Sequence, residues 1–563
     1  MFKKNKSLII LLGITLIGLA LRFWKLDQYP VSLNWDEVSH GYNAFSILKT
    51  GRDEWGNIFP LIFRAFGDYK LPVYIYLTVI PVLLFGLNAF SVRFISALAG
   101  TLAIPGIYFL TNALFKEKKM RVCRLDIEPG HLAAFLIALT PWHLFISRPA
   151  LEANLALTFV IYGFFFLLKA LSNPKFFLHA AILLGLSLHT YNSERVFVPM
   201  LFLVFVLIFR RQIRITRSAI IPAVIFLLAM GIVVSQVLSG TGTARYGKLK
   251  ILSENAVYQI GLSRQSSTLP QPLPVLLHNR PVYFVSAVAK NYIGYFSPQF
   301  LYQTRGVQTQ FAIPIKNLFS LPITILFIVG VVISVKSLSD KNRLFLMAWL
   351  FLSPLAASLT ADPPQSLRPN PMIPAVIILA AFGWLFLLRI IKPLLCQAVL
   401  ISVIFSVSFA LVRYLDTYYG EYAHYYSDSW QYGYSQMVDF VKSNGQKYDK
   451  IFITKTYGEP HIFYAFYNQL DPKLLWPGEN NIRYEQSDWF WTDRIGKIYF
   501  VNQWDIPQGG QRVDTLKLES GEVVDTKGSL LVTTFNYVPD NVEVEEVVEF
   551  VDGRFAFVIT SVQ

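Results

Sequence analysis

Two adjacent acids, Asp36 and Glu37, stand in the segment NWDEVSHGY shortly after an apolar N-terminal run. A carboxylate beside a bilayer can have its pKa tuned by desolvation and lipid head groups, which suits a general base. Two neighbouring carboxylates seldom share one role. We therefore predict that Asp36 is the catalytic base, and that Glu37 orients an acceptor or steadies Asp36.

Three cations at the ends of apolar segments could hold an anionic group. They are Lys70 in GDYKLP, Arg148 in SRPALEAN and Arg368 in SLRPNPMIP. An arginine can bind an oxyanion through two parallel hydrogen bonds, whereas a lysine acts as a point charge. We predict an anion-binding site from these three, and possible substrate contacts from Tyr42, Asp68, Glu152, Tyr191, Glu194 and Arg195.

Structural roles stay open for several of these residues. Arg148 could simply extend its charge to the membrane surface, and Arg195 could form a structural ion pair with Glu194. The other charges of the first loop, Asp53 and Glu54 among them, are expected to be solvated because loops carry charge at the surface.

Composition indicates the setting of this chemistry. Of the 563 residues, 54% are hydrophobic and 15% charged, and the mean hydropathy is +0.43, which indicates a multi-span membrane protein with a polar appendage. The net charge of +14 comes from short clusters between apolar runs, so no nucleic acid partner is expected. With only two cysteines, Cys123 and Cys396, no disulfide framework is expected.

Apolar runs near the length of a bilayer span recur along the chain. Four basic loops, at 116–124, 210–217, 336–343 and 389–392, all belong in the cytoplasm by the positive-inside rule. All four loops lie in the cytoplasm only if the segment 71–88 does not cross the membrane. The full set of candidates is 7–24, 71–88, 92–115, 131–147, 154–171, 176–190, 196–209, 219–238, 315–335, 344–360, 371–388 and 394–413.

Two prolines, Pro72 and Pro81, and two tyrosines make 71–88 typical of an interfacial or re-entrant helix. We therefore predict eleven full spans within a transmembrane module at 1–413, with a cytoplasmic N-terminus. The module has an outer catalytic loop at 25–91 and an outer loop at 239–312. Residues 414–563 read as a separate extracytoplasmic α/β domain, with helices predicted at YSQMVDFVKSN and EPHIFYAFYNQ and strands at KIFITK, KIYFVN, SLLVTTFNYV and FAFVITSV.

Together these motifs resemble a known family. The WDE of the first outer loop, the GDYK-L-P segment, the SR turn at Arg148 and the Arg-Pro motif at Arg368 resemble the GT-C membrane glycosyltransferases. Within them the chain is similar to the branch of the protein O-mannosyltransferases and the bacterial aminoarabinose transferase, over roughly residues 1–415. Relatives often have Lys-Pro-Pro where this chain has Lys70-Leu71-Pro72.

The resemblance implies a polyprenyl-phosphate sugar donor, a first-loop aspartate as base and a juxtamembrane helix at 71–88. With such a donor, Lys70, Arg148 and Arg368 are the predicted ligands of the departing donor phosphate. No cofactor is certain. Some relatives use a divalent metal and others do not, so an ion held by Asp36 or Glu37 stays open.

We therefore predict an inverting glycosyltransferase of the plasma membrane, with its active site at the outer face and a protein, lipid or glycan acceptor. The rival reading is a transporter or flippase of lipid-linked sugars. A transporter should place charges at the bilayer midplane and repeat its halves, and the sequence shows neither feature.

Overall fold

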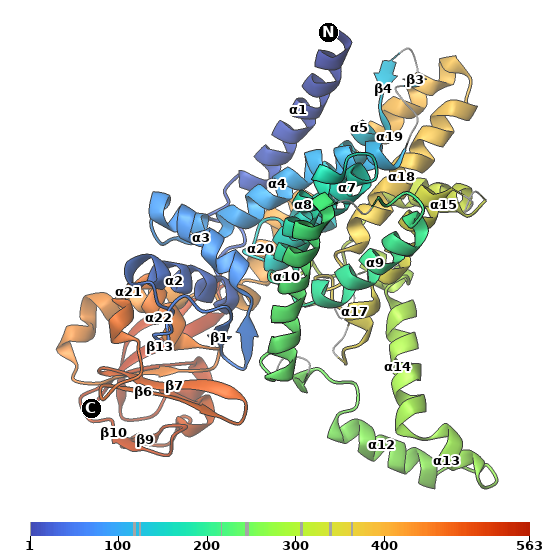
Figure 1. The fold of residues 1–563 in the computed structure, drawn as a ribbon. Helices are drawn as coiled ribbons and strands as arrows, with labels where there is room; N and C mark the ends of the chain where they lie inside the picture. Colours follow the sequence, from blue (N-terminus) through green and yellow to red (C-terminus); the bar gives the residue numbers. More distant parts are fainter. Residues whose placement is uncertain are drawn as a thin grey trace. The chain divides into compact units, whose positions relative to one another are not determined.

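The computed structural model describes residues 2–115, 120–122, 125–214, 217–242, 247–303, 308–336, 340–361 and 364–563. Figure 1 shows long helices and a β-sheet region formed by the C-terminal part of the chain. The chain divides into two compact units. The first comprises Met1–Arg22, Ser96–Ser147 and Glu152–Leu415, and the second comprises Phe23–Ile95, Arg148–Leu151 and Asp416–Gln563.

The first unit is helical. Its helices α15 (Leu321–Val335) and α18 (Met372–Ile390) approach closely, because a Cβ on Gly330 or Gly383 would overlap the backbone of the other helix. Small residues at such crossings are typical of membrane helices. The other helices of this unit are α5 (Pro129–Leu139), α6 (Pro141–Ile146), α7 (Glu152–Ala170), α8 (Phe177–Leu188), α9 (Glu194–Phe209), α10 (Ile220–Leu238), α12 (Glu254–Gln265), α13 (Leu273–Leu277), α14 (Arg280–Gly294), α16 (Lys341–Leu352) and α17 (Leu355–Ser358). Most residues of α1 (Phe2–Phe23), α4 (Ala89–Leu114) and α19 (Pro393–Tyr419) also belong to this unit, and the remainder of each belongs to the second.

Six helical segments among the described residues are long and apolar enough to cross a membrane, and four shorter apolar helices accompany them. The chain is a multi-pass membrane protein, as predicted, and the count of eleven spans stays a prediction. Helix α3 (Pro72–Phe85) has 14 residues, so it is about 21 Å long and falls short of the roughly 30 Å hydrocarbon core. Predicted spans such as α8 and α15 are also short, with 12 and 15 residues, so length does not distinguish α3 from them and the interfacial placement of 71–88 stays a prediction.

No disulfide framework was expected, and among the described residues one cysteine, Cys396, is bonded. This residue lies near the start of α19 with its side chain buried, and it is disulfide-bonded. Cys123 lies outside the described residues.

The second unit joins the first loop to the C-terminal segment. Helix α2 (Trp35–Thr50) packs against α3 and α22 (Pro460–Tyr467), and a hairpin of β1 (Phe63–Ala65) and β2 (Asp68–Lys70) leads into α3. Most of the surface of α2 is buried by protein, whereas a helix that lies on a membrane would bury one apolar face in the lipid.

The sheet of this unit has the order β12-β13-β11-β5-β8-β7-β6. Strand β5 pairs in parallel with β8 and β11, and the remaining pairs are antiparallel. The predicted elements are confirmed as α21 (Tyr434–Asn444), β5 (Ile451–Thr454), α22, β8 (Ile498–Val501), β11 (Leu530–Thr533) and β13 (Phe555–Val562). The strands β6 (Asn481–Gln486), β7 (Trp489–Ile495), β9 (Thr515–Lys517), β10 (Val523–Asp525) and β12 (Val542–Glu549) were missed.

Candidate active site

The first turn of α2 carries the acid pair. Asn34 caps this helix: its side chain accepts a hydrogen bond from the Glu37 backbone N–H at 3.0 Å, and its own N–H donates to the Glu37 carboxylate at 3.2 Å. This reciprocal arrangement is a capping box, which fixes where a helix begins. The cap therefore determines the directions in which Asp36 and Glu37 leave the backbone.

Glu37 is locked inside the second unit. Its carboxylate accepts from Arg93 Nε at 2.9 Å and Arg93 Nη2 at 3.1 Å, and from the Ala150 N–H at 2.8 Å. Both charged side chains are 0% exposed. Arg93 also donates to the carbonyls of Leu26, Pro30 and Ser32. With both of its carboxylate oxygens engaged, Glu37 holds three segments of chain together.

Asp36 is the accessible acid of the pair, with a side chain 43% exposed. Lys70 Nζ, on β2, donates to its carboxylate at 2.6 Å and to its backbone carbonyl at 3.1 Å. The Lys70 side chain is only 10% exposed, so the hairpin holds its ammonium against the start of α2. The Lys70 ammonium and the accessible Asp36 carboxylate thus lie together at the start of α2.

His40 lies one turn further along α2 and is 1% exposed. Burial and then the nearby charge of Lys70 hold the pKa of His40 well below its usual value, whereas Asp36 acts in the opposite direction. The imidazole is therefore neutral near pH 7, and its electrostatic coupling places it beside the Asp36 and Lys70 pair.

Arg148 is engaged by protein groups. Its Nη2 donates to the carbonyls of Trp24 at 2.8 Å and Tyr29 at 3.2 Å, and its Nε donates to the Tyr418 hydroxyl at 3.2 Å. The guanidinium also lies over the rings of Tyr418 and Tyr419. These contacts favour a structural role, in which Arg148 fixes the chain that follows α1.

The acids expected to be solvated are buried. Asp53 is 1% exposed and accepts hydrogen bonds from Trp55 and Asn57, and Glu54 is 2% exposed and pairs with Arg483 at 3.0 Å. The solvated-loop expectation was therefore wrong for both, because groups of its own turn satisfy Asp53 and Arg483 of β6 supplies a buried cation for Glu54.

Two further predicted substrate contacts lie in the second unit. The Tyr42 hydroxyl donates to the Leu470 carbonyl at 3.0 Å and its ring is buried, whereas Asp68 is partly exposed on β2 and accepts from the Tyr69 N–H at 2.7 Å. Asp68 lies two residues before Lys70 on the same strand, β2. Tyr42 is thus part of the core, and Asp68 lies nearer the accessible pair.

The remaining candidates belong to the first unit. Arg368 is 7% exposed and donates to the Thr360 hydroxyl at 2.7 Å. Glu152 begins α7 and is partly exposed, and Tyr191 is buried. Glu194 is 0% exposed, and its carboxylate oxygens have no hydrogen-bond partner within the described ranges. Arg195 donates instead to the Leu188 carbonyl and to Gln236.

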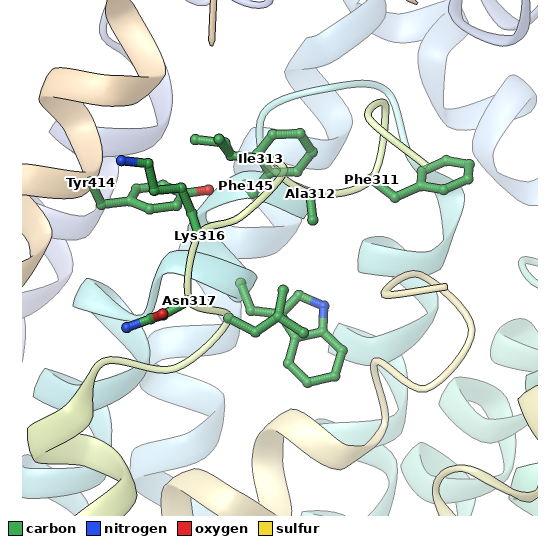
Figure 2. Close-up of a pocket in the computed structure, with 9 residues that line it drawn as sticks. Phe145, Phe311, Ala312, Ile313, Lys316, Asn317 and Tyr414 are labelled. Atoms are coloured by element: carbon green, nitrogen blue, oxygen red, sulfur yellow. The ribbon is translucent and has the colours of Figure 1, made fainter. Parts of the chain in front are cut away.

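A narrow pocket in the first unit holds polar groups that the sequence analysis did not single out (Figure 2). Lys316, Asn317 and Tyr414 line it together with aromatic side chains that include Phe145 and Phe311. Its volume of about 10 Å³ is close to what one water molecule needs. In this conformation the pocket is too small for a sugar.

Arg93 is the main site residue that sequence reasoning missed. It is the single charged residue in the apolar run 92–115, and an ionisable residue inside such a run is by itself a functional signal. No group of three or more His, Cys, Asp and Glu side chains that could hold a metal occurs within the described ranges. Because Glu37 is fully bonded, Asp36 is the acid of the pair with a surface open to an ion.

The chain is similar to known proteins in sequence and in fold. Residues 70–238 match the family model described as dolichyl-phosphate-mannose-protein mannosyltransferase. The structure is similar to ArnT from Cupriavidus metallidurans bound to undecaprenyl phosphate, with a TM-score of 0.54 and 12% identity, covering 99% of this chain and 97% of that one. The apo state of ArnT gives a TM-score of 0.53 at the same identity.

The oligosaccharyltransferase of Archaeoglobus fulgidus also matches, with a TM-score of 0.48 and 16% identity, over 83% of this chain. The chain spans 64% of the length of that enzyme. No curated protein sequence matches the chain. The family model and the ArnT fold confirm the predicted resemblance to GT-C glycosyltransferases.

Proposed function

We propose that this chain is an inverting membrane glycosyltransferase, which moves a sugar from a polyprenyl-phosphate donor to a hydroxyl group of a protein, lipid or glycan. The observation that carries the proposal is the accessible Asp36 carboxylate paired with Lys70, beside a Glu37 and Arg93 pair that is wholly buried. The family match to residues 70–238 adds support.

Asp36 acts as the general base in this proposal. It takes the proton of the acceptor hydroxyl, the oxygen attacks the anomeric carbon, and the bond from that carbon to the phosphate oxygen breaks. The polyprenyl phosphate leaves with an added negative charge. Base catalysis of this kind typically contributes about 10²- to 10⁴-fold to the rate.

Lys70 links the base to the donor. While it bonds Asp36 at 2.6 Å, it competes with the acceptor proton for the carboxylate. An arriving donor phosphate offers the ammonium a second anion, so Lys70 turns toward the phosphate and frees Asp36. Stabilisation of the leaving phosphate then grows with its charge in the transition state.

Glu37 acts as a positioning residue, since its hydrogen bonds hold the first turn of α2. Arg368 and Arg148 stay predicted phosphate ligands, and Asp68, Glu152, Tyr191, Glu194 and Arg195 stay predicted substrate contacts. We place the enzyme in the plasma membrane with a cytoplasmic N-terminus, and we place the active site and the C-terminal domain outside.

Sugar transfer by purified variants in nanodiscs tests the proposal. Asp36→Asn keeps the size of the side chain but cannot accept the proton, so transfer should fall by about 10²-fold or more while the melting temperature stays near that of the wild type. Asp27→Asn is the matched control, because Asp27 is an exposed acid of the same unit. Near wild-type turnover by Asp36→Asn would refute base catalysis by this residue.

A further inference from the structure

An apolar cavity of about 560 Å³ lies among α7, α8, α9 and α10 of the first unit. This volume falls in the range of roughly 300–1,000 Å³ that is usual for ligand sites. Leu167, Ala181 and Phe205 are among its apolar wall residues, and Arg214 is the charged side chain among the described residues that line it. The predicted catalytic and substrate-binding residues do not line it.

The cavity is bounded by α8 and α10. Near one end the two helices touch: a Cβ on Gly185 would lie 3.3 Å from that of Ala229, and His189 Nε2 lies 3.1 Å from the Ala229 carbonyl oxygen. Toward the other end, Phe177 of α8 and Ile220 of α10 line the wall. The short helices Pro174–Phe176 and Arg217–Ala219, which precede α8 and α10, are in contact at this end, so the cavity is enclosed at both ends between these helices.

The cavity is open to the hydrocarbon region of the membrane. Ile220, Val224 and Leu227 line the cavity and are 59%, 49% and 66% exposed. Large apolar side chains with such exposure on a membrane helix face lipid. A hydrocarbon chain of the bilayer can thus enter between the helices without crossing a polar surface.

Positively charged side chains lie at the end of the cavity next to the connection between α9 and α10. The connection RRQIRITR at 210–217 carries four arginines and no acid. Arg210, Arg211, Arg214 and Arg217 are all exposed, and Arg214 itself lines the cavity. Basic groups at the mouth of an apolar pocket between membrane helices complement an anionic lipid head group.

We propose that this cavity binds an anionic phospholipid, with one acyl chain between α8 and α10 and the head-group phosphate at Arg214. A polyprenyl phosphate shares this chemistry. We assign the site to a phospholipid because, in the orientation proposed above, this basic connection faces the cytoplasm, whereas the donor phosphate reacts at the outer face.

Lipid binding to the full-length protein tests the proposal. The protein is purified in neutral detergent, offered equal amounts of phosphatidylglycerol and phosphatidylcholine, and analysed by native mass spectrometry. We expect phosphatidylglycerol to be retained over phosphatidylcholine by roughly tenfold or more, since each membrane-surface cation favours anionic lipid several-fold. The combined variant R210Q/R211Q/R214Q/R217Q should lose that preference, and Ala223→Trp, which fills the cavity, should lose retention of both lipids.

The matched control is K336Q/K341Q, which removes two charges from another basic connection and should keep the preference. Equal retention of the two lipids by the wild type would overturn the proposal, as would unchanged retention by Ala223→Trp in a protein that melts normally. Displacement of phosphatidylglycerol by equimolar undecaprenyl phosphate would also overturn it and assign the cavity to the donor chain. Because no sugar transfer is measured, failure of the proposed glycosyltransferase activity is a separate result.

Discussion

Asp36 and Glu37 are neighbours in the chain with different environments. The Asp36 side chain is 43% exposed and touches a lysine, whereas Glu37 is wholly buried and has several hydrogen bonds, including two from Arg93. A buried charge is tolerated when it is paired and its remaining hydrogen-bonding capacity is satisfied. We therefore assign a catalytic role to Asp36 and a structural role to Glu37.

Lys70→Ala should weaken use of the donor more than it affects folding. The loss of one charge-assisted hydrogen bond to phosphate costs about 1.5–3 kcal/mol, which corresponds to a rise of roughly ten- to a hundredfold in the apparent KM for the donor. Steady-state transfer kinetics at varied donor concentration measure this. Lys49→Ala, at an exposed position of α2, is the control, and an unchanged donor KM in Lys70→Ala would remove Lys70 from the phosphate site.

His40 should make stability depend on pH. Its folded-state pKa lies well below the usual value through burial and the charge of Lys70, so the unfolded chain takes up a proton near pH 6.5 that the folded chain does not. The stabilisation is fully present above about pH 6.5 and falls by up to about 1.4 kcal/mol per pH unit below it. Melting temperatures from pH 7.5 to 5 should fall less steeply for His40→Gln than for the wild type; equal slopes would contradict this.

Helix α2 is positioned by contacts from several segments of the second unit. The Asn34 cap sets its start, Arg93 from the beginning of α4 holds its first turn, and Phe466 of α22 lies against Gly41, where a Cβ would clash. The accessible acid is thus carried on a rigid element. Precise placement of a base is what general base catalysis needs.

Arg93→Met should destabilise the protein strongly. It leaves the buried Glu37 carboxylate without its cation, and breaking a buried pair in this way costs about 3–5 kcal/mol. Thermal melting of the detergent-purified variant measures the loss. The double variant E37Q/R93M removes both charges and should recover part of the stability, whereas a single variant that melts like the wild type would show that the pair does not hold α2.

Sequence patterns predicted the helices and strands that are marked by periodicity or by an apolar run within the segment itself. The periodicity of the segments at α2 and α22 and the apolar runs at β5 and β13 identified these elements. The hairpin of β6 and β7 was missed because its turn residues, Ser487 and Asp488, adopt positive φ angles of 54° and 58°, and such turns are usually signalled by glycine. The roles of Arg93 and Glu54 depend on contacts across 56 and 429 residues, which no local pattern contains.

Two observations bear on the orientation of the whole chain. The basic connections at 210–217, 336–343 and 389–392 favour the cytoplasm, whereas the disulfide at Cys396 is typical of an oxidising compartment. Cys396 follows the basic segment 389–392 closely in sequence, so the two signals disagree about the same end of α19. We give more weight to the basic segments, because several independent connections agree and some intracellular proteins do contain disulfides.

Topology reporters decide between these signals. We expect a reporter fused after Arg211 to report a cytoplasmic location, because the arginines around it resist translocation. We expect a reporter fused after Gly420 to report an extracytoplasmic location, because α19 crosses the membrane once after the basic segment 389–392. Fusions are compared at equal expression, with a fusion after Lys392 as the internal control for the near end of α19. If the Gly420 fusion reads cytoplasmic, the outer location of the C-terminal domain is wrong; if the Lys392 fusion reads extracytoplasmic, the disulfide gives the correct orientation.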